Sequence, residues 1–322
     1  MLRDSHCLVT GGAGFIGSHV AAQLLAEGAH VRVLDNLSTG FESNLDVLRN
    51  EDQGNRLTVI NGDAADASAV AEAVDGVDYI FHLAAMASVP RSMREPALCH
   101  RWTATSTVEL LAAGAKAGTK RFILSSTSAA YGDSKYVSKR ETDPVAPMSP
   151  YAAAKLASEN YCAAFGREFK IDTVILRYFN VFGPRQDPAS EYSAVIPKFV
   201  SLILEGKRPI VFGDGGQSRD FIYVSDVAAA NLLAATHDDA PGRILNVGRG
   251  ESTTLLQLLD ELRLLLDRDI APIHEPARAG DVRQSLADIT ELESTLGYRP
   301  EVNIADGLRA SIDYYQAISS HA

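Results

Sequence analysis

A glycine-rich segment near the start of the chain, Gly11-Gly12-Ala13-Gly14-Phe15-Ile16-Gly17, limits the folds open to this sequence. An apolar stretch, His6–Thr10, precedes it, and a helical pattern over Ile16–Glu27 follows. Glycines let a backbone turn approach a diphosphate at a helix N-terminus, where unpaired N–H groups favour negative charge. The motif alone also occurs in ordinary tight turns, but its place between a strand and a helix predicts a dinucleotide-binding βαβ unit.

The first half of the chain repeats this alternation of short apolar runs and helical patterns, which is typical of stacked βαβ units. It predicts a doubly wound parallel sheet of the Rossmann type, α/β in class. The expected strands are His6–Thr10, His30–Asp35, Leu57–Asn61, Val77–Leu83, Arg121–Ser125 and Thr173–Leu176, and the expected long helices are Leu98–Ala117 and Pro150–Phe169.

The rhythm changes after about residue 178, where prolines and a glycine cluster at 213–216 interrupt shorter elements. We therefore expect a Rossmann domain over residues 1–177 and a smaller mixed α/β substrate lobe over 178–322. Ile244–Val247 is a candidate strand that returns to the large sheet. The cleft is expected where the lobe meets the carboxyl ends of the strands.

Acidic side chains at the ends of two predicted strands extend the dinucleotide hypothesis. Asp35 lies 18 residues after Gly17, where a carboxylate accepts both ribose hydroxyls and repels a 2′-phosphate. NAD is therefore favoured over NADP. Asp63 is a candidate adenine contact, and Leu83, Ala84 and Ala85 let the cofactor pass close to the backbone. The alternatives are a capping role for Asp35 and a turn role for Asp63.

Tyr151 and Lys155 lie four residues apart in a predicted helix whose first turn contains Pro150, so they share one face. A free tyrosine has a pKa near 10, and a base that works near pH 7 needs roughly 4 kcal/mol of phenolate stabilisation. The lysine ammonium and an oxidised nicotinamide supply such stabilisation in a cleft of low dielectric. Y-x-x-x-K is common by chance, but here it follows the serine-rich strand end 125–128.

Thr127 is the hydroxyl expected to hydrogen-bond the substrate alcohol, with capping of the strand-end turn as the alternative. His82 is a weaker candidate for a general base, because a histidine at a strand end is more often a packing residue.

The composition and net charge of the chain limit the kinds of partner that it is expected to bind. A formal charge of −11 leaves no basic field for a nucleic acid. The three cysteines show no metal spacing, so no metal site is expected. No signal segment and no apolar run of 18 residues is present, and we expect a cytoplasmic protein that does not enter a membrane.

Five segments together resemble the extended short-chain dehydrogenase/reductase family, and among its members the nucleotide-sugar 4-epimerases. They are Val9–Ser18, Asp35-Asn36-Leu37-Ser38-Thr39-Gly40, Ser149-Pro150-Tyr151, Leu176-Arg177-Tyr178-Phe179-Asn180 and Ser218-Arg219-Asp220-Phe221-Ile222. The resemblance runs nearly end to end. It implies NAD retained through the cycle, UDP-sugar substrates and a cytoplasmic homodimer.

The family's mechanism, placed on this chain, has the Tyr151 phenolate remove the proton of the sugar 4-hydroxyl while C4 gives hydride to NAD+. The 4-keto sugar then turns about its diphosphate and takes hydride back on its other face. The expected catalytic residues are Thr127, Tyr151 and Lys155. The expected cofactor site comprises Gly11, Gly14, Phe15, Ile16, Gly17, Asp35, Asn36, Ser38, Thr39, Gly40, Asp63, Ala64, Leu83, Ala84, Ala85, Tyr151, Lys155 and Phe179.

For the substrate, Arg219 and Arg278 match the family's diphosphate-binding arginines, and Asn180 matches a nucleotide-contacting asparagine. Either arginine has an alternative role in a surface salt bridge. The full expected substrate set is Ser88, Thr127, Tyr151, Asn180, Arg219, Arg278 and Ser285.

Two comparisons with the resembling family refine the reaction. Dehydratases carry Asp-Glu before the tyrosine that follows strand five, and decarboxylases carry a glutamate there. This chain has Ser128-Ala129-Ala130-Tyr131, with no acid, which favours epimerisation. Ser285 stands where glucose/galactose epimerases place a bulky tyrosine, and its small size favours N-acetylated UDP-sugars. The tract Arg185-Gln186-Asp187-Pro188 favours the same substrates.

One departure concerns the helix after strand four. The family's Asn-x-x-Gly is replaced there by Thr103 and Ser106, beside Trp102, which predicts a weaker cofactor contact. Alternatives to a UDP-N-acetylglucosamine 4-epimerase are a UDP-glucose or UDP-glucuronate 4-epimerase, an oxidoreductase that releases NADH, and a non-catalytic NAD-binding scaffold.

Overall fold

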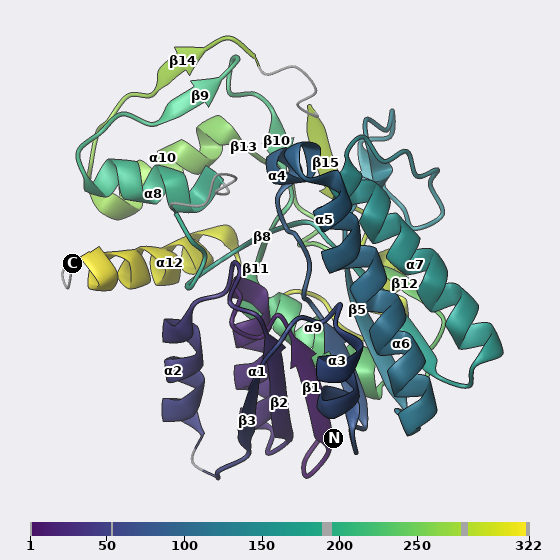
Figure 1. Ribbon diagram of the computed structural model, residues 1–322. Helices are drawn as coiled ribbons and strands as arrows, with labels where there is room; N and C mark the ends of the chain where they lie inside the picture. Colours follow the sequence, from purple (N-terminus) through teal and green to yellow (C-terminus); the bar gives the residue numbers. More distant parts are fainter. Residues whose placement is uncertain (1, 53, 189–194, 278–282, 320–322) are drawn as a thin grey trace.

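The computed structural model describes residues 2–52, 54–188, 195–277 and 283–319, and its centre is a seven-stranded sheet (Figure 1). Every strand pair in this sheet is parallel, in the order β12-β7-β5-β4-β1-β2-β3. The strands are β1 (His6–Thr10), β2 (His30–Asp35), β3 (Leu57–Asn61), β4 (Tyr79–His82), β5 (Arg121–Thr127), β7 (Asp172–Tyr178) and β12 (Ile244–Val247). The predicted Rossmann-type α/β class is confirmed.

The strand order reverses at β1, which has β2 on one side and β4 on the other. The chain first winds outward through β2 and β3 and then returns to build β4, β5 and β7 in the other direction. In doubly wound sheets this reversal leaves a crevice at the carboxyl ends of the strands, where ligands bind.

Helices cover both faces of the sheet, and each face has its own apolar core. One layer contains α1 (Phe15–Ala26), α2 (Glu42–Glu51), α9 (Val224–Thr236) and α11 (Thr290–Leu296). The other contains α3 (Ala67–Val74), α6 (Ser106–Ala117) and α7 (Pro150–Glu168). The strands between them are apolar on both faces, as expected for a parallel sheet buried on both sides.

The larger lobe draws on both halves of the chain. Ile244–Val247 pairs in parallel with β7 as the outermost strand, and α9 packs against α1. Both segments lie beyond residue 177.

The smaller lobe has a separate core, lined by α8 (Val195–Leu204), α10 (Leu255–Leu266) and α12 (Ile304–Ser319). Three groups of short strands accompany these helices: β8 (Asn180–Phe182) with β11 (Phe221–Tyr223), β9 (Ile210–Phe212) with β14 (Ile273–Glu275), and the set β13 (Thr253–Thr254), β10 (Ser218–Arg219), β15 (Gln284–Ala287) and β6 (Ser138–Lys139). Figure 1 shows this lobe standing over the carboxyl edge of the sheet.

The helical stretch expected over Leu98–Ala117 is present, but it is not α-helical throughout. The segment consists of α5 (Pro96–His100), a π-helical turn over Arg101–Thr105 and then α6. The hydroxyl of Ser106 donates to the carbonyls of Trp102 (2.8 Å) and Thr103 (3.1 Å), competing with the backbone ladder. Such local bonds favour a π-bulge that apolar periodicity does not reveal. Next to it lies α4 (Val89–Arg94).

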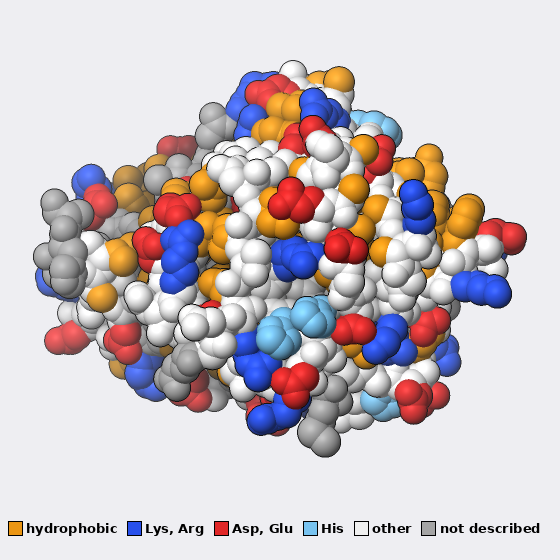
Figure 2. Space-filling model, turned by 60° about the horizontal axis from the view of Figure 1, so that its bottom comes forward, with side chains coloured by type: hydrophobic (Ala, Val, Ile, Leu, Met, Phe, Trp, Pro, Cys, Tyr) orange, Lys and Arg blue, Asp and Glu red, His pale blue; other side chains and the backbone are white. Residues whose placement is uncertain are grey.

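The surface carries mixed charge. Figure 2, which brings the lower side of Figure 1 forward, shows acidic and basic side chains interspersed over the face it displays, with no broad patch of one sign among the residues drawn in colour. Within the described ranges, no helix is long and apolar enough to cross a membrane.

Candidate active site

A cavity of about 440 Å³ lies at the carboxyl ends of the central strands. It is lined by all eighteen residues expected to bind the cofactor, together with Thr127 and Ser88. Its other lining residues are Leu34, Gly62, Met86, Ala87, Arg91, Trp102, Ser125, Ser126, Tyr178, Val181, Gln186 and Asp187.

The glycine turn between β1 and α1 forms one wall of the cavity and is built for close backbone approach. Gly11 has φ +71°, and a Cβ on it would lie 2.8 Å from the Ala84 nitrogen. A Cβ on Gly17 would lie 2.1 Å from the Gly11 carbonyl oxygen. Gly14 is the N-cap of α1 and has no side chain to satisfy the first N–H groups. This helix start lines the cavity, and unpaired N–H groups at a helix start suit a diphosphate.

Asp35, at the end of β2, is fixed by two backbone donors. Ala13 donates to its Oδ2 (2.9 Å) and Leu37 donates to its Oδ1 (2.8 Å). Each oxygen keeps a lone pair for a further hydroxyl. Burial raises the pKa of Asp35 above its ordinary value, while the two N–H donors act in the opposite direction. The arrangement fits a ribose diol.

The remaining residues on this wall come from strand ends and the loop after β2. Asn36, Ser38, Thr39 and Gly40 follow Asp35, and Gly40 packs so closely that a Cβ would lie 2.8 Å from the Ala13 Cβ. Asp63 accepts from the Ala65 N–H (2.9 Å) and pairs with Arg101 (3.3 Å). We call the lining residues from Gly11 to Ala85 the cofactor side.

Tyr151 and Lys155 project from the first turns of α7. Ser149 caps this helix by accepting from the Ala152 N–H (3.2 Å), and Pro150 occupies its first turn. The Lys155 ammonium donates to the Ser125 carbonyl at the end of β5 (2.6 Å). Burial lowers the pKa of Lys155 to about 8. The ammonium is therefore still mostly protonated at neutral pH, but it loses its proton at only slightly higher pH. Tyr151 packs beside Met86 and Cys99.

Thr127, the last residue of β5, lines the cavity and also caps the short helical turn Ser128–Tyr131. Its Oγ1 accepts from the Ala129 N–H (3.1 Å), which leaves the hydroxyl proton available to a ligand. The capping and ligand-binding interpretations are therefore compatible. We call Thr127, Tyr151 and Lys155 the reaction centre.

His82 does not line the cavity and is a packing residue, as the sequence had favoured. Its ring contacts the hydroxyls of Thr10 (2.7 Å) and Thr107 (3.1 Å) inside the core. Burial, together with the nearby Lys155 ammonium, lowers the pKa of His82 to about 3. A histidine this hard to protonate makes a poor general base near neutral pH.

The family's Asn-x-x-Gly position lies in the π-helical turn. Trp102 lines the cavity, whereas Thr103 and Ser106 are buried behind it. Instead of an asparagine, the wall here presents the Trp102 ring, with the Arg91 guanidinium 5.1 Å from its centroid.

Three expected substrate residues lie outside the cavity wall but next to one another in the fold. Arg219 of β10 is in register with Ser285 of β15, and the Asp220 N–H donates to the Ser285 carbonyl (2.8 Å). Asn180 donates from its side chain to the Asp220 carbonyl (3.1 Å). Arg278 lies outside the described residues.

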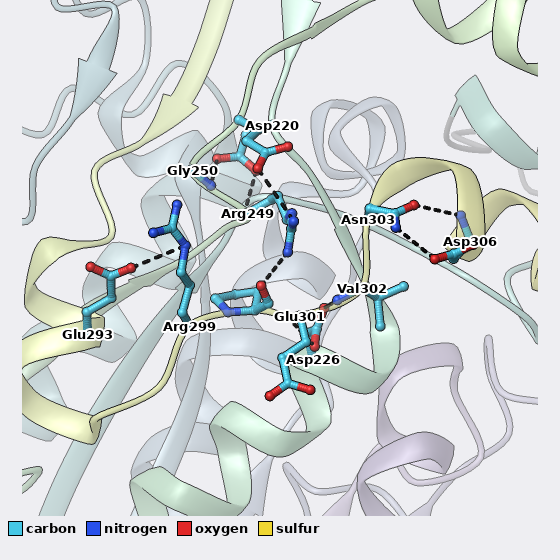
Figure 3. A network of polar contacts seen from close by, with 12 residues as sticks. Asp220, Asp226, Arg249, Gly250, Glu293, Arg299, Glu301, Val302, Asn303 and Asp306 are labelled. Atoms are coloured by element: carbon cyan, nitrogen blue, oxygen red, sulfur yellow. Dashed lines mark hydrogen bonds and ion pairs between the residues drawn. The ribbon is translucent and has the colours of Figure 1, made fainter.

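The Asp220 side chain connects the segments that carry these residues. Its buried carboxylate accepts from the N–H groups of Arg249 (2.7 Å), Gly250 (3.0 Å) and Ala287 (3.1 Å), and Figure 3 shows the first two of these contacts. Burial raises the pKa of Asp220 to about 6, against the effect of the three donors. The side chain fixes β10 and β15 relative to the loop after β12.

Sequence reasoning did not assign several lining residues to the site. Gln186 and Asp187 reach the cavity from the chain that enters the smaller lobe, and Arg91 reaches it from α4. The tract 185–188 had been noted only for its resemblance. Among the described residues, no group of three or more His, Cys, Asp or Glu side chains is placed to hold a metal ion.

The fold and this cavity define a dinucleotide-binding enzyme of the short-chain dehydrogenase/reductase type, with a tyrosine–lysine pair beside the cofactor side. Comparison with known proteins is more specific. The family model described as "NAD dependent epimerase/dehydratase family" matches residues 7–248. The chain belongs to this family, and the prediction of NAD as the cofactor is confirmed.

Similar proteins include the UDP-glucose 4-epimerase of Mycolicibacterium smegmatis, 35% identical over 96% of this chain and 98% of that protein. A structure of UDP-N-acetylglucosamine 4-epimerase from Methanobrevibacter ruminantium, in complex with UDP-N-acetylmuramic acid, superposes with a TM-score of 0.92. It is 39% identical and covers 99% of this chain and 100% of that one. A dTDP-glucose 4,6-dehydratase of Streptomyces niveus is 34% identical over 96% of this chain and 92% of its own length.

Proposed function

We propose that this protein is an NAD-dependent 4-epimerase of UDP-sugars that prefers N-acetylated substrates, UDP-N-acetylglucosamine and UDP-N-acetylgalactosamine. The observation that carries the proposal is the meeting of the reaction centre and the cofactor side in one cavity. The similar epimerases named above support the choice of substrate class.

The chain's own residues would act in a fixed order. The Tyr151 phenolate accepts the proton of the sugar 4-hydroxyl, while Thr127 donates a hydrogen bond that orients that hydroxyl. The Lys155 ammonium, held by the Ser125 carbonyl, stabilises the phenolate. Hydride exchange at C4 is the chemistry that NAD supplies when bound. For the return step, Tyr151 gives its proton back to the sugar oxygen.

The composition of the turn after Thr127 supports epimerisation over elimination. The turn that follows Thr127 contains Ser128, Ala129 and Ala130, where dehydratases would need a proton donor. The carboxyl groups of the lining are Asp35 and Asp63 on the cofactor side and Asp187 at the smaller lobe.

The substrate nucleotide would bind at the junction of the two lobes. Arg219 and Arg278 are proposed to hold the diphosphate and Asn180 the nucleotide, with Ser88 at the sugar. Ser285 neighbours Arg219 in the strand register and would leave room for an N-acetyl group. A preference for UDP-glucose, as in the mycobacterial relative's name, is the second candidate.

We also propose that the protein is a cytoplasmic homodimer. Tyr161 on α7 and Phe169, the residue that follows this helix, are 44% and 54% exposed, which gives this region an apolar surface for a second copy. The three cysteines are buried free thiols, which suits a reducing compartment. Light scattering at micromolar concentration tests the assembly: a mass of one chain would contradict it.

The reaction is tested by incubating the purified protein with UDP-glucose, UDP-glucuronate, UDP-N-acetylglucosamine and their C4 epimers. NMR of the sugar ring gives the C4 configuration, and absorbance at 340 nm reports any released NADH. We expect interconversion of the two N-acetylated sugars without free NADH. Steady accumulation of NADH would favour a net oxidoreductase, and no change in any substrate would favour a scaffold.

A further inference from the structure

A buried ion pair lies directly behind the reaction centre. Arg177 of β7 donates to both oxygens of Glu159 on α7, from Nε (2.9 Å) and from Nη2 (2.7 Å). Both side chains are only 3% exposed. Burying two charges carries a large desolvation penalty, so a pair retained inside a core calls for a reason other than stability.

Glu159 also holds the end of β5. The Ser126 hydroxyl donates to Glu159 Oε1 at 2.5 Å. Ser126 lies between Ser125, whose carbonyl receives the Lys155 ammonium, and Thr127 of the reaction centre. All three of these strand-end residues line the cavity. The carboxylate therefore reaches the cavity wall through one hydrogen bond.

Arg177 also contacts the turn that follows β5. Its guanidinium lies 4.8 Å from the ring centroid of Tyr131, the last residue of the turn that Thr127 caps. The Tyr131 hydroxyl donates to Asn246 Oδ1 on β12 (2.7 Å). The end of β5 and the turn after it are thus held from α7, β7 and β12 at once.

We propose that Glu159 and Arg177 are positioning residues, which set the geometry of Thr127 and Lys155 by clamping the end of β5 against α7. This inference rests on the proposed function. The residues Tyr151, Lys155 and Glu159 follow one another at four-residue intervals, so the base, its ammonium partner and the clamp share one face of α7. A shift of about 1 Å at such a centre lowers turnover about a hundredfold.

The Glu159 carboxylate of the clamp also affects the pKa of Lys155. The titratable groups that shift the pKa of this ammonium are Cys99 on α5 and Glu159 and Cys162 on α7, and the ammonium in turn lowers the pKa of His82 on β4. Glu159 supplies the carboxylate of this set, and its negative charge raises the pKa of Lys155 against the lowering effect of burial. Loss of this charge therefore lowers the pKa of Lys155.

The test compares Glu159→Gln with Ser126→Ala, which removes the hydrogen bond and leaves the ion pair. Asp226→Asn is the matched control. Asp226 is also buried and accepts from Tyr298 (2.8 Å), Glu301 (3.1 Å) and Val302 (3.0 Å), away from the cavity (Figure 3). For each variant, kcat, KM, the pH profile of kcat and the melting temperature are measured with the holoenzyme.

We expect Glu159→Gln to lower kcat about tenfold to a hundredfold with KM within threefold of wild type. The basic limb of its pH profile moves to lower pH, because Lys155 loses its proton earlier. Asp226→Asn lowers the melting temperature and leaves the profile in place. A Glu159→Gln variant with kcat within twofold of wild type and an unmoved profile overturns the proposal. If that variant does not fold, Ser126→Ala decides: a fall in kcat of about tenfold supports the clamp, and kcat within twofold of wild type overturns it.

A readout that does not depend on turnover separates this inference from the proposed function. In protein labelled with ¹³C at the lysine ε-carbon, the Lys155 signal is identified by its loss in Lys155→Arg and is titrated by NMR. Glu159→Gln should lower the titration midpoint. A wild-type protein inert toward every UDP-sugar would refute the proposed function, whereas an unchanged midpoint together with unchanged kcat in Glu159→Gln would refute the clamp.

Discussion

The cofactor side of the cavity and the proposed substrate residues differ in how they are assembled. The cofactor side is made by backbone turns at the ends of β1, β2, β3 and β4, each beside the strand that positions it. Asn180, Arg219 and Ser285 meet only because short strands from three distant segments pair. The cofactor side is thus set by local sequence, whereas the proposed substrate residues meet through contacts between distant parts of the chain.

The largest effect is expected at Tyr151, which the proposed reaction places between the cofactor and the sugar. Tyr151→Phe removes one oxygen and no packing surface, so NAD affinity should stay within threefold of wild type. Loss of the base should lower kcat about a thousandfold or more. Isothermal titration with NAD and a coupled turnover assay measure the two quantities. Equal loss of NAD binding and turnover would mean that the tyrosine belongs to the cofactor side alone.

Gly17→Ala attacks the cofactor side through its backbone. The new Cβ would lie 2.1 Å from the Gly11 carbonyl oxygen, so the backbone of the turn must move to make room for it. This movement costs about 3 kcal/mol of strain energy. If that strain falls on the bound state, NAD affinity drops about a hundredfold. Gly76→Ala is the control, because it also strains a backbone turn, at φ +68°, but does not line the cavity. Similar NAD affinities for the two variants would contradict the role of the turn.

Acid should weaken the contact between the lobes. His19 of α1 contacts the Pro184 carbonyl at the entry to the smaller lobe (3.0 Å), and burial lowers its pKa to about 4. Since the unfolded histidine titrates near 6.5, the unfolded state binds a proton first as the pH falls. Stability should drop between pH 6.5 and 4, by on the order of 3 kcal/mol for this residue.

Urea unfolding at pH 7 and pH 4.5 measures this loss, and His19→Gln should flatten it. The glutamine can still donate to Pro184. If the free energy of unfolding falls by the same amount between pH 7 and pH 4.5 in wild type and variant, groups other than His19 cause the acid sensitivity.

The smallest predicted change concerns sugar selection. Ser285→Tyr should lower kcat/KM for N-acetylated UDP-sugars at least about tenfold relative to kcat/KM for UDP-glucose. NAD affinity stays as in wild type, because Ser285 lies outside the cofactor side. Equal loss for both substrates would show that Ser285 is not the selecting residue.

That the expected cofactor residues would lie together could be predicted because their signals are local. The glycine turn, Asp35 and the small residues 83–85 each follow a buried strand directly, and all of them line the cavity. The Tyr151–Lys155 pair was found for the same reason, since one helix places both side chains.

Two kinds of feature were not predicted: those that depend on side-chain hydrogen bonds competing with the backbone, and those formed by segments far apart in the sequence. The π-helical turn at Arg101–Thr105 arises from hydroxyl bonds that leave the apolar period unchanged. Arg91 and Asp187 reach the cavity because α4 and the entry to the smaller lobe fold over it, which no local pattern encodes. β4 (Tyr79–His82) is shorter than the expected Val77–Leu83, because the apolar run continues past the paired residues into the turn and loop.

The central claim is that Tyr151 exchanges a proton with the sugar 4-hydroxyl beside a retained NAD. It is tested most directly with UDP-N-acetylglucosamine deuterated at C4. We predict that the wild-type product, UDP-N-acetylgalactosamine, keeps its deuterium at C4, and that Tyr151→Phe forms no product. Loss of deuterium to solvent, or full turnover by Tyr151→Phe, would contradict the account.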